Sequence, residues 1–197
     1  MPGQACTFKT QDAGRPHDVI FKPFFRVHER RYSVYWDLFT PETWQARQAE
    51  YEAEVARQKA LEARTLDFFQ PGEMQPERDH DLEGERTGAG EAMGRKCRHA
   101  TGGGWFSFTL AVRPDEPTQL VCTYWGSDAG RVFDILIDGE KLATETLDNS
   151  RPNHFFDKIY ALPKRLTRGK TKVTIKLQAH PGNTAGGVLG VRMVKAD

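Results

Sequence analysis

The segment FDILIDGEKLATETL, residues 133–147, indicates the fold most clearly. Apolar side chains occupy every second position up to Ile137, as in a strand that buries one face. Asp138 and Gly139 follow, and an Asp-Gly pair between two strand-like runs is a strong signal for a two-residue hairpin turn. We therefore expect one strand to end at Ile137 and a second strand to return over residues 141–147.

The same alternation extends along most of the chain on both sides of this hairpin. The alternating positions are Phe106, Phe108, Leu110 and Val112; Val121, Thr123 and Trp125; Phe156, Tyr160 and Leu162; Val173, Ile175, Leu177 and Ala179; and the run 188–194. Many short strands separated by turn signals at regular intervals are typical of sandwiches. The sequence predicts an all-β domain over 67–197, an antiparallel β-sandwich of jelly-roll type.

An N-terminal β-hairpin segment is predicted within residues 1–40. Two β-rich runs lie between Val19 and Phe39, and the second places Tyr32, Val34, Trp36 and Leu38 on one face. A two-stranded hairpin is marginally stable on its own in water. We expect its apolar face to pack against the sandwich or against a second copy of the chain.

A long helix is predicted next, as a connecting segment over 41–66. Thr40 suits the N-cap, Pro41 the first helical position and Glu42 the positive end of the helix dipole. The helical composition continues to about Arg64. The apolar stripe is thin and contains Trp44, Tyr51 and Val55. We expect a surface strut, through which the chain could also self-associate or contact a catalytic barrel.

The passage from 71 to 104 is polar and has no apolar period, so a long irregular connection is expected there. Its carboxyl groups could supply the pair that glycoside hydrolysis requires. They belong to Glu73, Glu77, Asp79, Asp81, Glu83 and Glu85. A solvated acidic loop explains the same composition.

Composition excludes several classes of protein. The 197 residues carry 28 basic and 27 acidic side chains, so no excess charge draws the chain to nucleic acid or to an anionic membrane. No apolar run is long enough to span a bilayer, and the N-terminus has no basic-then-apolar secretion signal. The three cysteines, Cys6, Cys97 and Cys122, lack the spacing of a zinc site and are interpreted as buried or free thiols.

A carbohydrate site is predicted where aromatic and polar side chains meet at strand ends. Sugar recognition needs an aromatic surface beside the sugar ring and polar groups that satisfy its hydroxyls. The candidates are Arg98, Trp105, Trp125, Asp128, Arg131 and Asn183. Both tryptophans could instead pack in the core, and 180–183 could be only a turn between strands.

We expect a domain that needs no cofactor, and metal binding is the alternative. The histidines that could converge on a transition metal across the sandwich are His80, His99, His154 and His180. Asp79, Asp81 and Glu83 have the oxygen-rich composition that calcium prefers, but they lack the ligand spacing of an EF-hand.

Five blocks of the chain carry a family resemblance. They are KPFFRVHERRYSVYW (22–36), PGEMQPERDHDLEGERTGAG (71–90), GRKCRHATGGGWFSF (94–108), TYWGSDAGRVFDILIDGEKLATETL (123–147) and QAHPGNTAGGVLGVRMV (178–194). In this order they resemble the C-terminal, non-barrel part of the β-L-arabinofuranosidases, glycoside hydrolase family 127. That family's catalytic cysteines belong to an α-helical barrel that this sequence lacks, so no catalytic residue carries over.

Three functions follow, in order of preference. The first is a non-catalytic accessory sandwich that contacts a plant-type glycan or a catalytic module. The second is a purely structural or interaction module. The third is a small independent carbohydrate-active enzyme that uses the acidic loop or a histidine-bound metal. As part of a longer exported hydrolase, the chain would be periplasmic or extracellular.

Overall fold

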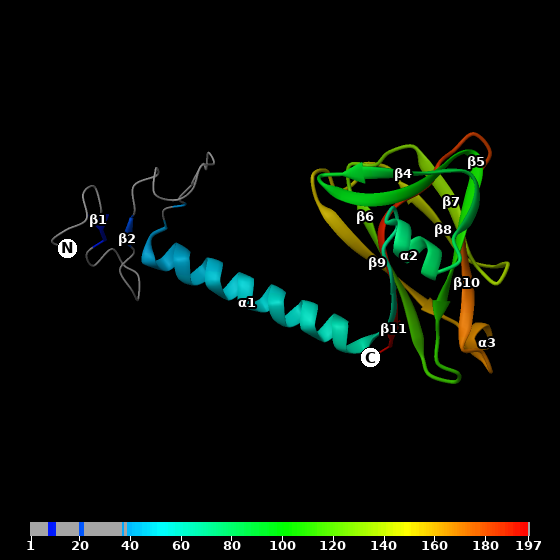
Figure 1. Cartoon of the computed structure of the whole chain (residues 1–197), viewed down its shortest axis with the longest axis horizontal. Helices are drawn as coiled ribbons and strands as arrows, with labels where there is room; N and C mark the ends of the chain where they lie inside the picture. Colours follow the sequence, from blue (N-terminus) through cyan, green and yellow to red (C-terminus); the bar gives the residue numbers. More distant parts are fainter. Residues whose placement is uncertain (1–7, 11–19, 22–36, 38, 197) are drawn as a thin grey trace. The chain divides into compact units, whose positions relative to one another are not determined.

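The computed structural model describes residues 8–10, 20–21, 37 and 39–196 (Figure 1). The chain divides into two compact units, Met1–Arg57 and Gln58–Asp197. In the first unit, β1 (Phe8–Lys9) pairs in antiparallel fashion with β2 (Ile20–Phe21). Apart from β2, the strands predicted between 19 and 39 lie outside the described residues. So do the four side chains of their apolar face, which are Tyr32, Val34, Trp36 and Leu38.

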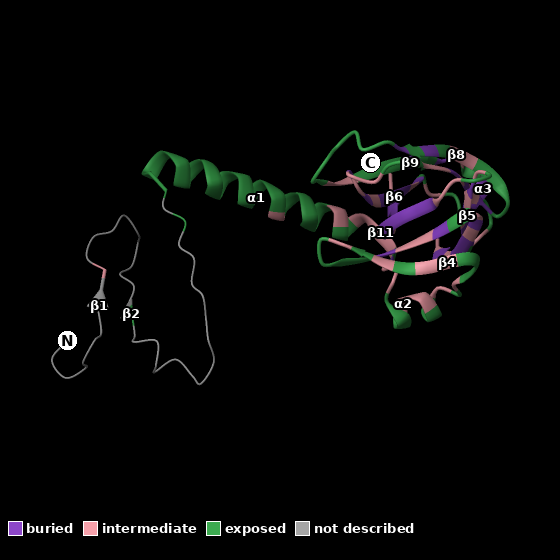
Figure 2. Cartoon of the chain, turned by 90° about the horizontal axis from the view of Figure 1, so that it is seen from above, coloured by how far each residue is buried: buried purple, intermediate pink, exposed green. Residues whose placement is uncertain are grey.

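Helix α1 (Pro41–Arg64) begins where the sequence predicts. The backbone N–H of Thr43 donates to Thr40 Oγ1 at 3.3 Å, which confirms Thr40 as the cap. No residue of α1 is buried, and Trp44 is 49% exposed, so the helix is not part of a core (Figure 2). The helix ends at Arg64, because the following residues already belong to a strand. No helix in the described part of the chain has the length and apolarity that a membrane crossing requires.

The second unit is an antiparallel sandwich with two short helices. Its strands are β3 (Thr65–Phe69), β4 (Glu83–Ala92), β5 (Arg95–Ala111), β6 (Thr118–Trp125), β7 (Arg131–Ile137), β8 (Glu140–Leu147), β9 (Phe155–Leu162), β10 (Lys172–Ala179) and β11 (Ala185–Lys195). The helices are α2 (Met74–Asp79) and α3 (Lys164–Thr167). The predicted all-β sandwich is confirmed.

Strand β5 belongs to both layers of the sandwich. Its second half pairs with β10, which continues to β7 and β8; we call this layer one. Its first half pairs with β11, which continues to β6 and β9 and also pairs with β3; we call this layer two. The strand changes layer at the triple glycine, where Gly102 and Gly103 have positive φ angles of 59° and 80°. A Cβ on Gly104 would lie 2.4 Å from the carbonyl oxygen of Glu85, so this bend requires glycine.

The core lies between the two layers and uses most of the predicted apolar positions. The alternating residues of β10 and β7 are buried, and the Asp138-Gly139 turn has positive φ at both residues, as predicted. The layers meet through aromatic contacts. Phe69 stacks on Phe108 with ring centroids 4.2 Å apart, which joins β3 to the second half of β5.

The predicted face of β6 is wrong. The residues that enter the core are Leu120, Cys122 and Tyr124, whereas Thr123 and Trp125 lie on the outer side. Because apolar residues occur on both sides of this strand, the sequence period does not distinguish its inner side from its outer side.

The prediction of an irregular connection over 71–104 is also wrong. This passage forms α2, β4 and the first part of β5. Strands β4 and β5 are joined by Met93 and Gly94, which both have positive φ angles, as in a two-residue hairpin. Most side chains of β4 are exposed, so the backbone ladder forms without an apolar period in the sequence.

Candidate functional site

Two aromatic side chains lie together on the outer side of layer two. Trp125 ends β6, Phe155 begins β9, and the two residues are paired in register. Their ring centroids are 4.7 Å apart, and both side chains are partly exposed. Their neighbours Tyr124 and Phe156 point the opposite way, toward the core, because side chains alternate along a strand.

An arginine covers one side of this aromatic pair. The guanidinium carbon of Arg95 lies 4.5 Å from the centroid of the Phe155 ring. Arg95 is the first residue of β5, directly after the hairpin turn, and Figure 1 shows this hairpin crossing one end of the sandwich. The site therefore combines an aromatic surface with a cation at a fixed position.

The two loops beside the pair are bonded to each other. The loop 126–130 follows Trp125, and the loop 148–154 precedes Phe155. The N–H of Gly126 donates to the carbonyl of His154 at 2.8 Å. A Cβ on Gly126 would lie 1.9 Å from the carbonyl oxygen of Arg151, so only glycine allows this close approach of the loops. The loops thus hold a fixed position beside the aromatic pair.

The loop 148–154 presents exposed polar groups that were not among the sugar-ligand candidates selected from the sequence. They are the side chains of Asn149, Ser150, Arg151, Asn153 and His154. Together they offer amide, hydroxyl, guanidinium and imidazole groups, which suit the hydroxyls of a sugar. The dense run NSRPNH directly before two aromatic residues is the signal that could have identified them.

Asp128 and Arg131 form an ion pair at the loop that follows Trp125. Arg131 Nη2 donates to Asp128 Oδ1 at 2.6 Å, and Arg131 Nη1 donates to the carbonyl of Gly186 at 3.1 Å. Partial burial raises the pKa of Asp128, and the Arg131 guanidinium opposes that rise. These two residues, each predicted as a sugar ligand, are thus bonded to each other and join loop 126–130 to β11.

Cys97 and His99 lie on β5 next to this ion pair. Burial raises the pKa of the Cys97 thiol. Burial, together with the charges of Arg131 and Arg98, lowers the pKa of His99. Both groups therefore favour their neutral forms, and Cys97 is not an activated nucleophile. Cys97 and Cys122 are buried and form no disulfide, as predicted, whereas Cys6 lies outside the described residues.

The structure gives Arg98 a different partner. Its guanidinium forms two hydrogen bonds with the Glu77 carboxylate, at 2.5 and 2.6 Å. Only 11% of the Arg98 side chain and 13% of the Glu77 side chain are exposed. This ion pair attaches α2 to β5 and leaves little of the guanidinium for a ligand.

Trp105 and Asn183 are also separate from the aromatic pair. Trp105 lies on the outer side of layer one, where the ammonium of Lys176 is 4.2 Å from its ring centroid. Asn183 lies in the turn between β10 and β11, and its amide donates to the carbonyl of Pro181 at 3.2 Å. Of the six predicted sugar ligands, Asp128 and Arg131 are bonded to each other, and the backbone N–H of Asp128 donates to the carbonyl of Trp125 at 3.1 Å.

The four candidate metal histidines have separate surroundings. His80 Nε2 lies 3.2 Å from Asp67, and His180 Nε2 lies 3.0 Å from Asp134. His154 Nδ1 contacts the carbonyl of Pro152, and His99 lies beside Cys97. Over the described ranges, no three His, Cys, Asp or Glu side chains are grouped as metal ligands.

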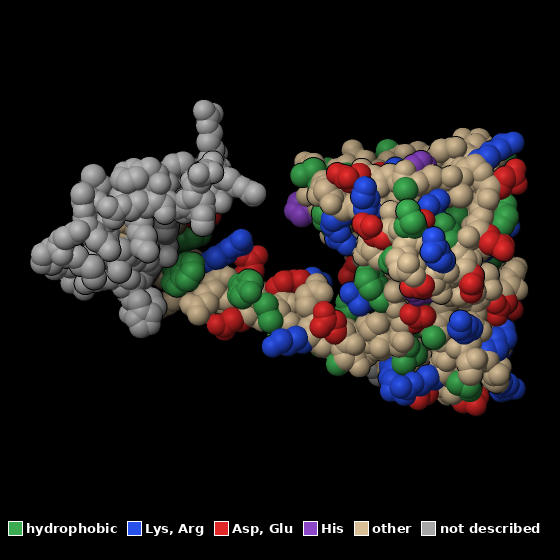
Figure 3. All heavy atoms as spheres, in the orientation of Figure 1, with side chains coloured by type: hydrophobic (Ala, Val, Ile, Leu, Met, Phe, Trp, Pro, Cys, Tyr) green, Lys and Arg blue, Asp and Glu red, His purple; other side chains and the backbone are tan. Residues whose placement is uncertain are grey.

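The residues considered for calcium are held by local contacts. Gln75 donates to Asp79 Oδ1 at 2.7 Å, and Thr109 donates to Asp81 Oδ2 at 3.1 Å. Acidic and basic side chains are interspersed over the face of the sandwich seen in Figure 3. This mixed surface agrees with the near-zero net charge of the chain.

Comparisons with known proteins find similar solved structures. A family 35 carbohydrate binding module from Clostridium thermocellum is 13% identical, with a TM-score of 0.46, and covers 66% of this chain and 97% of its own. The CBM36-1 domain of a xylanase from the Trinervitermes trinervoides hindgut metagenome is 15% identical, with a TM-score of 0.47 and coverages of 66% and 97%. The C-terminal CBM6 of LamC from Zobellia galactanivorans is 13% identical, with a TM-score of 0.45 and coverages of 65% and 98%. Similarities at this level do not identify a ligand or an activity.

No curated protein matches the chain. A family model does match it, over residues 60–194. This range contains β3 to β10 and almost all of β11, so the match covers the sandwich together with the end of α1. The chain therefore belongs to the family described as "Family of unknown function (DUF6805)".

Proposed function

We propose that the sandwich is a non-catalytic carbohydrate-binding module. The observation that carries the proposal is the pair of outward-facing aromatics, Trp125 and Phe155, beside the polar loop 148–154. An aromatic ring packs against the apolar face of a sugar, and neighbouring amide and guanidinium groups satisfy the hydroxyls. A pair that served only the core would lie on the inner side of the same strands, where Tyr124 already packs.

The surroundings of the acidic residues support a binding role over a catalytic one. Those considered for hydrolysis are distributed over α2, β4 and the residues beside them. Glu77 is paired with Arg98, and Asp128, in the loop that follows Trp125, is paired with Arg131. Both carboxylates are thus engaged by arginine, whereas glycoside hydrolysis needs two carboxyl groups that face one scissile bond.

We further propose that the module accompanies a glycoside hydrolase-type catalytic unit and contacts a plant-type glycan. The support for this finer statement is the resemblance to the non-barrel region of the β-L-arabinofuranosidases. Arabinofuranose-containing polymers are therefore the first probes to use.

Affinity gel electrophoresis with soluble arabinan, arabinogalactan and arabinoxylan tests the proposal. The wild-type chain should be retarded by at least one polymer, and Trp125→Ala should reduce its affinity by roughly fivefold or more, since a central aromatic contact contributes ~1 kcal/mol or more. The thermal midpoint should change little, because Trp125 is outside the core.

Trp44→Ala, which truncates an exposed tryptophan on α1, is the matched control and should keep full retardation. Two results oppose the proposal. Wild-type protein that no polymer retards would favour the structural-module function. Retardation that survives Trp125→Ala but is lost in Trp105→Ala would move the site to layer one.

A further inference from the structure

The outer side of layer two continues beyond the aromatic pair in two further cross-strand rows. Two residues along β6 from Trp125, the register aligns Gly190, Thr123 and Asp157, which we call the polar row. Two residues further, it aligns Phe68, Arg192, Val121 and Ile159, which we call the far row. Trp125 and Phe155 form the aromatic row. All three rows face away from the core, because the residues between them on each strand point inward.

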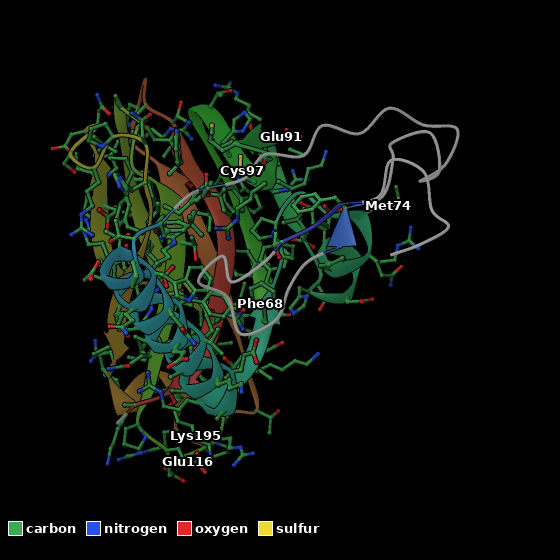
Figure 4. All side chains as sticks on the ribbon, turned by 90° about the vertical axis from the view of Figure 1, so that its left-hand side faces the viewer. Phe68, Met74, Glu91, Cys97, Glu116 and Lys195 are labelled. Carbon is green, nitrogen blue, oxygen red and sulfur yellow. The ribbon has the colours of Figure 1, made fainter. Side chains whose placement is uncertain are left out.

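The far row repeats the chemistry of the aromatic row. The guanidinium carbon of Arg192 lies 4.0 Å from the centroid of the Phe68 ring, just as Arg95 lies over Phe155. Phe68 is 39% exposed and Ile159 is 58% exposed, although Val121 between them is covered. Figure 4 shows Phe68 on the face of the sandwich that is turned toward the viewer, below Glu91 and Cys97 of the β4–β5 hairpin.

The polar row between them offers hydrogen-bonding groups and has no large side chain. Thr123 Oγ1 donates to Asp157 Oδ1 at 2.7 Å. Within the described part of the chain, this is the one hydrogen bond of the Asp157 side chain, so its second oxygen can accept from a ligand. At Gly190 a Cβ would meet Phe68 at 3.4 Å and Thr123 at 3.7 Å, which is ordinary contact. A larger residue would therefore fit at this position. Because glycine has no side chain, nothing projects from β11 in the middle of this face.

We propose that the three rows form one continuous site for a polysaccharide chain rather than for a single terminal sugar. The aromatic and far rows are four residues apart along β6, which is roughly 13 Å and more than one sugar ring can span. A glycan lying obliquely across the strands, from β9 and β6 at the aromatic row to β3 at the far row, would contact an aromatic ring with its arginine at each end. Between the two rings it would cross the polar row at Thr123 and Gly190, beside the Asp157 carboxylate. This inference rests on the proposed function, because the aromatic row is shared.

The alternation of the rows favours a glycan over a docked protein. A protein partner that covered this face would enclose the second oxygen of Asp157 and would have to supply a donor for it. A glycan presents hydroxyl donors along its whole length, between ring faces that pack on aromatic side chains. The continuity with the aromatic row also places both ends of the ligand on a single surface.

The test compares ligand lengths. The probes are the polymer that most retards the wild-type chain, together with the disaccharide and hexasaccharide prepared from it, measured by isothermal titration calorimetry. Wild-type affinity should rise from the disaccharide to the hexasaccharide. Phe68→Ala should weaken hexasaccharide binding by roughly threefold to tenfold, since an aromatic contact of this kind contributes a factor of that size, and should leave the disaccharide unchanged. Met74→Ala, an exposed apolar truncation on α2, is the matched control and should change neither.

The possible outcomes separate this inference from the function on which it rests. If Trp125→Ala abolishes binding but Phe68→Ala leaves hexasaccharide affinity intact, the module binds a short ligand and the extended site is wrong. If affinity does not rise with length, the extended site is also wrong. If no polymer binds at all, both proposals fail together. A second variant, Arg192→Ala, should repeat the length-dependent loss, because the Arg192 guanidinium lies over the Phe68 ring.

Discussion

The two sides of β6 and β9 differ in how their polar and aromatic groups are satisfied. On the inner side, Tyr124 is fully buried, and its hydroxyl lies 3.3 Å from that of Tyr160. Tyr160 in turn donates to Glu145 Oε2 at 2.5 Å, and Lys158 donates to Glu145 Oε1 at 2.7 Å. On the outer side, the next residue along β6, Trp125, packs on one aromatic neighbour and keeps part of its surface open.

This difference shows how one pair of strands can serve two purposes. The inner groups have protein partners and contribute to stability. Burial raises the pKa of Tyr124 and of Tyr160, so both remain protonated at neutral pH. The outer groups retain open surface and hydrogen-bonding capacity that a ligand could use in place of water. Substitutions on the inner side should therefore change stability, and those on the outer side should change binding.

The largest expected effect is at Tyr124. Tyr124→Ala removes a fully buried ring that contacts Phe133 and Phe156, and it leaves a cavity between the layers. We expect the free energy of unfolding to fall by about 3–5 kcal/mol, as for other buried aromatic truncations. Urea unfolding followed by far-UV circular dichroism measures this loss. A change below ~1 kcal/mol would mean that the inner side does not carry the stability.

A smaller loss is expected at Glu145, whose side chain is only 2% exposed. Glu145→Gln keeps an acceptor for Tyr160 but removes the charge that pairs with Lys158. We expect about 1–2 kcal/mol of destabilisation in the same urea experiment, because hydrogen bonds to a charged group contribute about this much and Lys158 remains half exposed.

The matched control lies on the same strand. Glu140→Gln breaks the exposed ion pair between Glu140 and Arg165, and it should change stability by less than ~0.5 kcal/mol. Equal losses of unfolding free energy in Glu145→Gln and Glu140→Gln would show that the buried Glu145 network contributes no more to stability than an exposed ion pair.

The smallest expected effect is a pH dependence that comes from His99, at the end of the sandwich. In the folded protein the pKa of His99 is lowered from 6.5. The unfolded chain therefore binds a proton more readily, so the stability that neutral His99 contributes is present above pH 6.5 and decreases as the pH falls toward the folded pKa. The slope of unfolding free energy against pH below 6.5 should flatten in His99→Gln. An unchanged slope would assign the dependence to another group.

Much of the fold could be predicted from the sequence, because its strands bury one face each. β10 has a strict alternation, the Asp138-Gly139 turn has its own signal, and α1 has a cap and a helical composition. The hairpin of β4 and β5 could not be predicted, since backbone pairing forms it and its side chains remain exposed. The orientation of β6 could not be read either, because apolar residues lie on both of its sides.

The candidate site was only partly predictable. Trp125, Asp128 and Arg131 are close in sequence, and the loop after Trp125 joins the Asp128 and Arg131 side chains in an ion pair. Arg98 was misplaced because Glu77, its partner, lies on a helix that the polar sequence did not indicate. Phe155 and its pairing with Trp125 depend on the register between β6 and β9, which no local pattern encodes.

The most direct test of the glycan-binding claim uses the indole N–H signals of the protein. Its four tryptophans give separate probes, which are Trp36, Trp44, Trp105 and Trp125. In 15N-edited NMR spectra, the signal of Trp125, assigned by substitution, should shift progressively as the hexasaccharide of the retarding polymer is added, while those of Trp44 and Trp105 stay in place. A shift of Trp105 with Trp125 unmoved, or no indole shift at saturating hexasaccharide, would contradict the account.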